Sequence, residues 1–483
     1  MTVTSIAFNY AAALPEIVLA GAACVILVVD LFVAESQRPI SYWLTQLTLL
    51  AAAYLTLASP DDMPLRAFGN MFVTDKLADV LKLFACIAVS LTLFYSRGYL
   101  AARGLFRGET FVLMLTSLLG MMVMISANSF VTLYLGLELM SLSLYAMVAL
   151  QRESERAVEA SMKYFVLGAL ASGFLLYGMS MLYGATGTLE ISGVADAIVN
   201  AHSNRVILVF GLVFVVSAIA FKLGAVPYHM WIPDVYDGAP TAVTLFIGSA
   251  PKLAAFAFAM RLLVGSLSAL AFDWQGMLLV LSLLSMLFGN IIAIAQSSIK
   301  RMLAYSTIAN MGFMLMGFLG ATSDAYSAAM FYTVTYVLTT LVGFGVVLLL
   351  SREGFEADRL DDFKGLNQRS PWYAFMMLLA MFSLAGVPPT VGFYAKFSVI
   401  AAAVDIGLVW LAVVAVLASL IGAFYYLRVV KLMYFDDPVD APPIAARGDA
   451  RLLLSVNGLA LLLLGVFPQK LMGWCVLALT HSY

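Results

Sequence analysis

Long apolar runs dominate this sequence and constrain its fold more than any other feature. Of the 483 residues, 63% are hydrophobic and only 11% are charged, against about 25% charged residues in a typical soluble domain. A run of about 20 apolar residues is long enough to cross a bilayer as a helix. The runs are continuously apolar rather than alternating, and backbone groups in lipid must bond within their own segment. Helices are therefore expected instead of β-strands.

The apolar runs predict an all-α polytopic membrane protein with about fourteen transmembrane helices. We expect these helices near residues 14–34, 40–58, 77–97, 110–126, 128–150, 158–185, 205–236, 240–266, 274–296, 300–320, 326–351, 371–403, 406–434 and 451–479.

Basic residues between these spans gather on one side of the predicted membrane. The odd-numbered loops hold sixteen Lys and Arg residues, Lys300 among them, and the even-numbered loops hold five, Arg261 among them. Cytoplasmic loops are enriched in Lys and Arg. Both termini are therefore expected on the non-cytoplasmic side of the membrane.

The five of the twenty-six Lys and Arg residues that are not assigned to a loop are all lysines: Lys82, Lys163, Lys222, Lys252 and Lys396. Arginine stays charged in proteins, whereas a desolvated lysine can release its proton. Lys222, Lys252 and Lys396 lie far from the span ends and are expected to carry protons. Lys163 is either a proton carrier or a side chain that snorkels to the interface. Lys82 is expected to anchor its helix at the interface.

Two predicted spans contain prolines close to one of these lysines. The seventh span carries Pro227 after Lys222, and the twelfth carries Pro388 before Lys396. Proline removes a helix hydrogen bond, and irregular backbone is tolerated at membrane depth only where protein or water satisfies it. Helices 7 and 12 are therefore predicted to be discontinuous. Their separation by five helices indicates two inverted five-helix repeats, helices 4–8 and 9–13.

These repeats divide the chain into four predicted parts. They are an N-terminal three-helix segment (1–108), a first antiporter-like repeat (109–268), a second, inverted repeat (269–435) and a C-terminal helix 14 (436–483).

Glu138 lies near the middle of the fifth span, where a carboxylate is costly unless it is paired. Lys222 is its expected partner, and a purely structural ion pair is the alternative. His229 follows Lys222 by seven residues. It is either a proton relay between Lys222 and Lys252 or a packed polar residue. Without further ligands at suitable spacing, it does not indicate a metal site.

One face of the eleventh span carries hydroxyl groups at helical spacing. They belong to Tyr332, Thr335, Tyr336, Thr339 and Thr340. This face suits either a file of waters between charged residues or interhelical packing through small polar groups.

Several functions are excluded by composition. Cys24, Cys86 and Cys475 are isolated in apolar runs, so no iron–sulfur, haem or other cofactor site is expected in this chain. A net charge of −2 argues against nucleic-acid binding. The loops are too short for a large catalytic domain acting on lipid-linked substrates. Redox chemistry, if coupled to this chain, belongs to other chains.

Four segments together resemble the antiporter-like membrane subunits of respiratory complex I, the proton-translocating NADH:quinone oxidoreductase. They are GLELMSLSLYAM around Glu138, GAVPYHMWIPDVYDGAPT after Lys222, SSIKRMLAYSTIANMGF, and GVPPTVGFYAKF at Lys396. A lysine at position 396, a lysine on the eighth span and this chain length resemble the subunit N branch more than the M or L branches.

The resemblance implies a role for each titratable residue. Glu138 and Lys222 would form a control pair, Lys252 would bridge, and Lys396 would carry the proton at the exit side. Lys163 matches a further family lysine. NADH, FMN, iron–sulfur clusters and quinone would be held by partner subunits. A small K-type subunit, an M subunit and membrane lipid would surround the chain. The same superfamily includes subunits of multi-chain sodium/proton antiporters, which is the alternative function.

Overall fold

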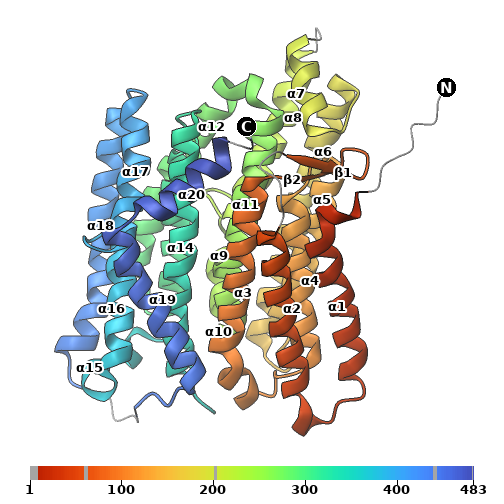
Figure 1. Cartoon of the computed structure of the whole chain (residues 1–483). Helices are drawn as coiled ribbons and strands as arrows, with labels where there is room; N and C mark the ends of the chain where they lie inside the picture. Colours follow the sequence, from red (N-terminus) through yellow and green to blue (C-terminus); the bar gives the residue numbers. More distant parts are fainter. Residues whose placement is uncertain (1–8, 59–63, 201–203, 439–442, 481, 483) are drawn as a thin grey trace.

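A computed structural model describes residues 9–58, 64–200, 204–438, 443–480 and 482 as a bundle of roughly aligned helices (Figure 1). Within these described ranges, twelve helical segments are long and apolar enough to cross a membrane. The predicted all-α membrane fold is confirmed. The count of fourteen stays a prediction, because α13 and the interrupted pair α16/α17 are not among the twelve.

The first part of the chain forms three long helices and a small hairpin. Asp75 starts the third helix by accepting a hydrogen bond from the N–H of Ala78 at 2.8 Å. The hairpin pairs its two strands antiparallel, with Arg66 opposite Val73. The elements are η1 (Tyr10–Ala13), α1 (Leu14–Asp30), η2 (Glu35–Gln37), α2 (Pro39–Leu57), β1 (Leu65–Ala67), β2 (Phe72–Thr74) and α3 (Lys76–Ala102).

The next part contains a closely packed helix pair, α4 against α5. A Cβ added at Gly120 would lie 2.3 Å from the main-chain N of Met140, and one at Gly136 would lie 2.6 Å from that of Met124. Glycine therefore lets the two backbones touch. The elements are α4 (Gly108–Ile125), α5 (Phe130–Val148), α6 (Glu155–Thr186), α7 (Ile191–Asn200), α8 (Arg205–Leu223), α9 (Trp231–Gly238), α10 (Thr241–Gly248), α11 (Ala250–Ala259) and the π-helix η3 (Met260–Ser266).

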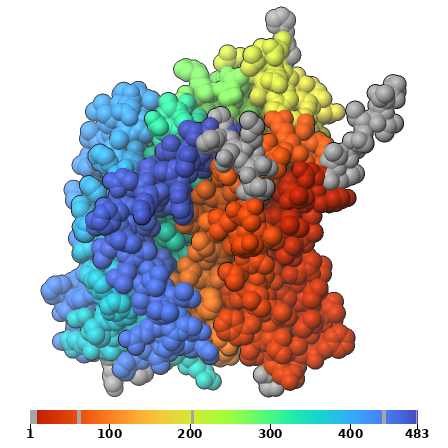
Figure 2. All heavy atoms as spheres, viewed as in Figure 1, coloured from red at the N-terminus to blue at the C-terminus, as the bar shows by residue number. Residues whose placement is uncertain are grey.

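The remaining elements include α14, whose most apolar stretch is 94% buried. They are η4 (Ser268–Leu270), α12 (Ala271–Ile294), α13 (Ile299–Met316), α14 (Ser323–Leu350), η5 (Leu360–Phe363), α15 (Leu366–Arg369), α16 (Pro371–Ala385), α17 (Val391–Asp405), α18 (Val409–Phe435), α19 (Gly448–Val466) and α20 (Gln469–Thr480). In the space-filling view, dark-blue C-terminal residues cover part of the orange surface of α3 (Figure 2).

Both predicted helix breaks are present. The seventh span stops after Leu223 and resumes at Trp231, and the twelfth stops after Ala385 and resumes at Val391. Each first half ends at a left-handed glycine, Gly224 with φ +83° and Gly386 with φ +84°. Left-handed φ favours glycine because it has no Cβ, so each break is encoded by a glycine as well as by proline.

Two further interruptions were not predicted. The span near 240–266 is divided at Ser249 into α10 and α11, with Pro251 near the start of α11. The last predicted span, 451–479, is not continuous. It divides around Pro468 into α19 and α20, and a Cβ at Gly465 would lie 2.0 Å from the main-chain oxygen of Pro389. The end of α19 therefore packs directly on the break between α16 and α17.

Candidate functional site

Glu138 of α5 and Lys222 of α8 are each held by a serine rather than by one another. The Lys222 ammonium donates to Ser141 Oγ at 2.8 Å. The Glu138 carboxylate accepts a short hydrogen bond from Ser172 of α6. Since Ser141 follows Glu138 by three residues, both lie on one side of α5. The direct ion pair is not present in this conformation, and Ser141 holds the ammonium instead.

Ser141 and Ser172 were not among the sequence-predicted site residues. The available signal was the three-residue spacing between Glu138 and Ser141 in GLELMSLS. Ser172 lies thirty-four residues away from its partner on another helix, and nothing local in the sequence marks it. Both glutamate and lysine side chains are only partly covered by the rest of this chain.

Lys252 lies at the start of α11, just after the interruption at Ser249, and is only 1% exposed. Its ammonium donates to the main-chain oxygen of Leu223, the last residue of α8, at 2.9 Å. It also lies 5.6 Å from the ring centroid of Trp231, whose indole N–H donates to Phe221 O at 2.9 Å. The lysine thus satisfies the carbonyl of the last residue of the broken helix. The tryptophan adds a second donor to Phe221 O, which also accepts the N–H of Gly224 at 3.1 Å.

Lys396 makes the corresponding contact at the second break. Its ammonium donates to the main-chain oxygen of Ala385, the last residue of α16, at 3.1 Å, and lies 4.8 Å from the ring centroid of Phe313. The side chain is 8% exposed. A cation is favoured at a helix C-terminus by the helix dipole. Lys252 and Lys396 therefore occupy equivalent electrostatic positions, each at the carbonyl end of a half-helix.

His229 lies in the first break, between α8 and α9. Its side chain is partly exposed, and its Nδ1 is buried without a hydrogen-bond partner among the described residues. The hydrogen bonds of Lys222 and Lys252 go to other groups. The choice between a proton relay and a packed polar residue stays open.

Lys163 lies on the outer side of α6 and is 44% exposed in the isolated chain. Its ammonium is 2.8 Å from both Glu159 and Asp234. Asp234 of α9 also pairs with Arg301 of α13 at 3.0 Å. Lys163 thereby ties α6 to the second half of the broken seventh span.

The hydroxyl face predicted on the eleventh span is buried on α14 and bonds mainly to α13. Tyr332 donates to Asn310 Oδ1 and Tyr336 donates to Thr307 Oγ1, both at 2.7 Å. Thr339 lies 3.0 Å from Ser383 Oγ on α16. These bonds fit the packing interpretation.

Two small voids beside this face also suit the water interpretation. One, of about 10 Å³, is lined by Tyr332, Tyr336 and Lys396 among others. The other, also of about 10 Å³, is lined by Thr307, Tyr336 and Thr340 among others. A void of roughly 10–15 Å³ of this kind holds one water. The hydroxyls therefore border two water-sized spaces, one of which touches Lys396.

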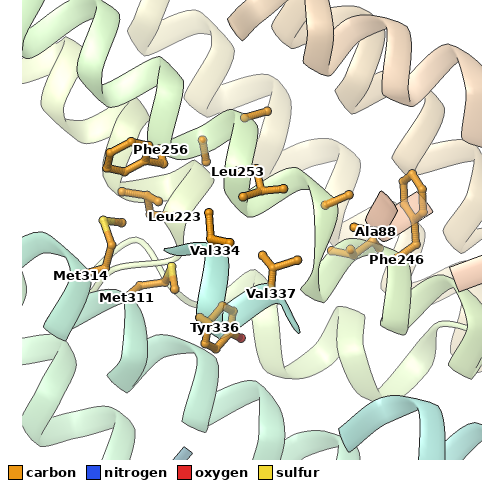
Figure 3. Close-up of a cluster of buried hydrophobic side chains, with 14 of the residues drawn as sticks. Ala88, Leu223, Phe246, Leu253, Phe256, Met311, Met314, Val334, Tyr336 and Val337 are labelled. Carbon is orange, nitrogen blue, oxygen red and sulfur yellow. The ribbon is translucent and has the colours of Figure 1, made fainter. Parts of the chain in front are cut away.

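An apolar cluster lies between the first break and the hydroxyl face (Figure 3). Leu223 and Leu253 come from the side of the first break, and Met311, Met314 and Val334 face them from α13 and α14. All five are buried. Tyr336 of the hydroxyl face belongs to the same cluster. A packed apolar layer therefore lies beside the first break.

Three buried basic residues depart from the sequence-based expectations. Lys82 is not an interfacial anchor: it is 1% exposed and pairs with Glu16 of α1 at 2.5 Å. Arg261, expected in a loop, is buried in the π-helix and pairs with Asp75 at 2.6 and 2.8 Å. Buried cations in this bundle are therefore not exclusively lysines.

Lys300 is also buried rather than in a loop, and donates to Ala239 O at 3.0 Å. Composition alone does not distinguish a buried cation from a loop cation where a charged residue falls near a span end. For Lys82 and Arg261, the feature that identifies a buried cation is its acidic partner, Glu16 or Asp75, which lies far away in the sequence.

Known proteins are similar to this chain over nearly its full length. The family model described as "NADH:quinone oxidoreductase/Mrp antiporter, TM" matches residues 127–422. A protein of Thiobacillus denitrificans called NADH-quinone oxidoreductase subunit N is 61% identical over 98% of both chains.

Solved structures share the fold. A chain of respiratory complex I from Thermus thermophilus superposes with a TM-score of 0.81 at 31% identity, covering 95% of this chain and 98% of that one. A chain of the Mrp complex from a Dietzia species superposes with a TM-score of 0.86 at 22% identity, covering 99% and 98%, which shows a common fold alone. On the identity, the coverage and the family match, this chain belongs to the subunit N branch of the NADH:quinone oxidoreductase/Mrp antiporter membrane-subunit family.

Proposed function

We propose that this chain translocates protons as a membrane-arm subunit of a bacterial NADH:quinone oxidoreductase. The observation that carries the proposal is the placement of Lys252 and Lys396 at the carbonyl ends of two half-helices. At such a position the helix dipole favours the charged lysine, while burial favours the neutral one. A lysine held between these opposing effects can change protonation when a nearby charge moves.

Glu138 and Lys222 are proposed as the switch that moves this charge. In the present conformation Ser172 and Ser141 hold the two side chains apart. A charge change in a neighbouring subunit would draw the carboxylate toward the ammonium or release it. An anion beside an ammonium favours its charged form. Forming the pair therefore retains a proton on Lys222, and breaking it favours passing the proton on.

The energetic scale is adequate for pumping. A membrane potential of 100 mV opposes each outward elementary charge by about 2.3 kcal/mol. Removing one partner of a buried ion pair costs about 3–5 kcal/mol. Making and breaking one pair with Glu138 therefore matches the work of moving one proton.

The onward route is proposed to run from Lys222 through Lys252 to Lys396. The voids beside Tyr332, Tyr336 and Thr340 would hold waters near its end. The apolar layer at Met311, Met314 and Val334 would have to admit water transiently, so protons cross only when the site opens. His229 and Lys163 are proposed accessory relays, in the break and at the outer side of α6.

The matching glycines, lysine contacts and positions of the two breaks support the proposed inverted repeats at 109–268 and 269–435. The flanking parts, 1–108 and 436–483, would brace them. We further propose that NADH, FMN, iron–sulfur clusters and quinone are bound by partner subunits, with K-type and M subunits as the neighbours in the inner membrane.

Affinity purification of the chain from its native membrane tests this assignment. The proposal predicts co-purification with NADH oxidation activity, FMN and subunits carrying iron–sulfur clusters. Co-purification with a set of antiporter subunits, with sodium-dependent proton exchange and no NADH oxidation, would support the alternative function instead.

A further inference from the structure

A cavity of about 500 Å³ opens at the end of the bundle where α15 lies, the lower end in Figure 1. Its walls come from the last turns of α3 and α14, from the segment after α14, from α15 and from the start of α19. None of the residues proposed for proton transfer lines it. The cavity therefore needs an explanation of its own.

The interior of this cavity is apolar and its rim is cationic. Phe94, Leu348 and Leu349 contribute apolar wall, while Arg352 and Arg369 contribute positive charge. Arg447 at the rim lies 3.6 Å from Asp449, which offsets part of its charge. Such a combination suits an amphipathic anion.

The acid beside the two arginines at the rim offsets only part of their charge. Asp362 also lines the cavity, but its carboxylate, which accepts the main-chain N–H of Arg359 at 2.9 Å, is one negative charge against two positive ones. Only the main-chain oxygen of Asp362 accepts a hydrogen bond from Arg369, at 2.9 Å. The Nε of Arg369 is buried and has no partner within the described part of the chain. The guanidinium of Arg352 packs over the Phe355 ring, 4.9 Å from its centroid.

The electrostatics of the two arginines favour the binding of an anion. Burial and the positive charge of Arg352 both lower the pKa of the Arg369 guanidinium. A phosphate between the two arginines would relieve their repulsion and accept charge-assisted hydrogen bonds from both.

A second cavity at the same end of the bundle provides a contrast. It has about 570 Å³, and its charged lining residues are Arg103, Arg107, Arg152, Glu109 and Glu153. Glu109 and Glu153, together with Glu356 that pairs with Arg103, balance the three arginines there, so it lacks the net positive rim of the first cavity. It serves as an internal control with the same residue types.

We propose that the cavity between α3, α14 and α19 binds an acidic phospholipid, with the phosphate between Arg352 and Arg369 and acyl chains along Phe94, Leu348 and Leu349. The expected orientation places this end of the bundle at the cytoplasmic face, where anionic lipids attract basic residues. Arginine is well suited to this role because its planar fork matches a phosphate. The bound lipid would join the N-terminal helices to the C-terminal ones.

The test uses the intact complex, purified in detergent, stripped of lipid and titrated with dioleoylphosphatidylglycerol. Bound lipid is counted by native mass spectrometry. Each basic residue near a membrane surface contributes about 1 kcal/mol to binding an anionic lipid. R352Q/R369Q should therefore bind one phosphatidylglycerol roughly 30-fold more weakly than the unchanged complex, since about 1.4 kcal/mol corresponds to tenfold. R107Q/R152Q in the second cavity should bind as the unchanged complex does.

A second variant separates a lipid from a free phosphate. Gly98 lines the cavity on α3, and a Cβ there meets nothing within 4 Å, so G98F fills the cavity without a clash at the backbone. G98F should lose the phosphatidylglycerol. Phosphatidylcholine should not occupy the site in any variant.

Three outcomes would overturn the proposal. They are unchanged phosphatidylglycerol binding in R352Q/R369Q, unchanged binding in G98F, and occupancy by inorganic phosphate at millimolar concentration in place of lipid. Density for a polypeptide of a neighbouring subunit in the cavity would overturn it as well.

Discussion

At the scale of single residues, the site depends on which group holds each ammonium. Lys222 is held by a hydroxyl, whereas Lys252 and Lys396 are held by main-chain carbonyls. A hydroxyl can be exchanged for another partner by a side-chain rotation, but a carbonyl at a helix end stays in place. Lys222 is therefore the lysine best placed to move.

Ser141→Ala tests the hydroxyl that holds Lys222. A hydrogen bond to a charged group contributes about 1.5–3 kcal/mol, so NADH-driven proton pumping should fall roughly tenfold or more while the complex still assembles. Ser143→Ala is the matched control, because Ser143 on the same helix bonds Thr116 and Leu139 instead. Equal pumping by the two variants would remove Ser141 from the switch.

A charge-preserving substitution distinguishes lysines that change protonation from lysines that only pair. Arginine does not lose its proton in proteins, so Lys396→Arg should stop proton pumping with the complex assembled. Lys82→Arg should leave pumping intact, because Lys82 is explained by its ion pair with Glu16. Proton uptake into inverted membrane vesicles measures both. Pumping by Lys396→Arg at the unchanged rate would contradict a proton-carrying role.

At the scale of helices, the breaks are the feature on which the site depends. Gly386 has φ +84°, and a Cβ there would lie 2.9 Å from Lys396 Cδ. Gly386→Ala should therefore strain the turn by about 1–2 kcal/mol and displace the lysine. Less assembled complex with a lower thermal unfolding temperature is expected.

Gly173→Ala is the control for this prediction. Gly173 lies inside α6, and its added Cβ meets nothing within 4 Å. Alanine favours a helix over glycine by about 1 kcal/mol, so this variant should assemble at least as well as the unchanged chain. Loss of assembly in both variants would show that any added methyl group is harmful, rather than one at the break.

The helices were largely predictable because each apolar run has the length of one crossing. The breaks at Gly224 and Gly386 were also predictable, since proline and glycine occur together there. The break at Ser249 was missed because a lone proline in the middle of a span, here Pro251, can kink a helix without dividing it. The division at Pro468 was missed for the same reason.

The pairing of charges was less predictable than their burial. The sequence indicates that Glu138, Lys222, Lys252 and Lys396 lie at membrane depth, but not that each would bond a group on another helix or at a helix end. Glu16, Asp75 and Arg261 illustrate the same limit. Their pairs join residues far apart in the sequence, and only tertiary packing determines them.

At the scale of the whole molecule, the asymmetry of basic residues predicts an orientation. Both termini should face the non-cytoplasmic side, and the segment between α14 and α15 should face the cytoplasm. Alkaline phosphatase, which is active only outside the cytoplasm, should be active when fused after Thr480 and inactive when fused after Gly354. The reverse pattern would invert the proposed direction of proton transfer.

The central claim is that one buried acid controls proton movement through the entire chain. It is tested most directly by NADH-driven acidification of inverted membrane vesicles containing Glu138→Gln, with the amount of assembled complex measured alongside. The account predicts full assembly with proton pumping abolished and coupled NADH oxidation lost. Proton pumping at the unchanged rate in fully assembled Glu138→Gln complex would contradict it.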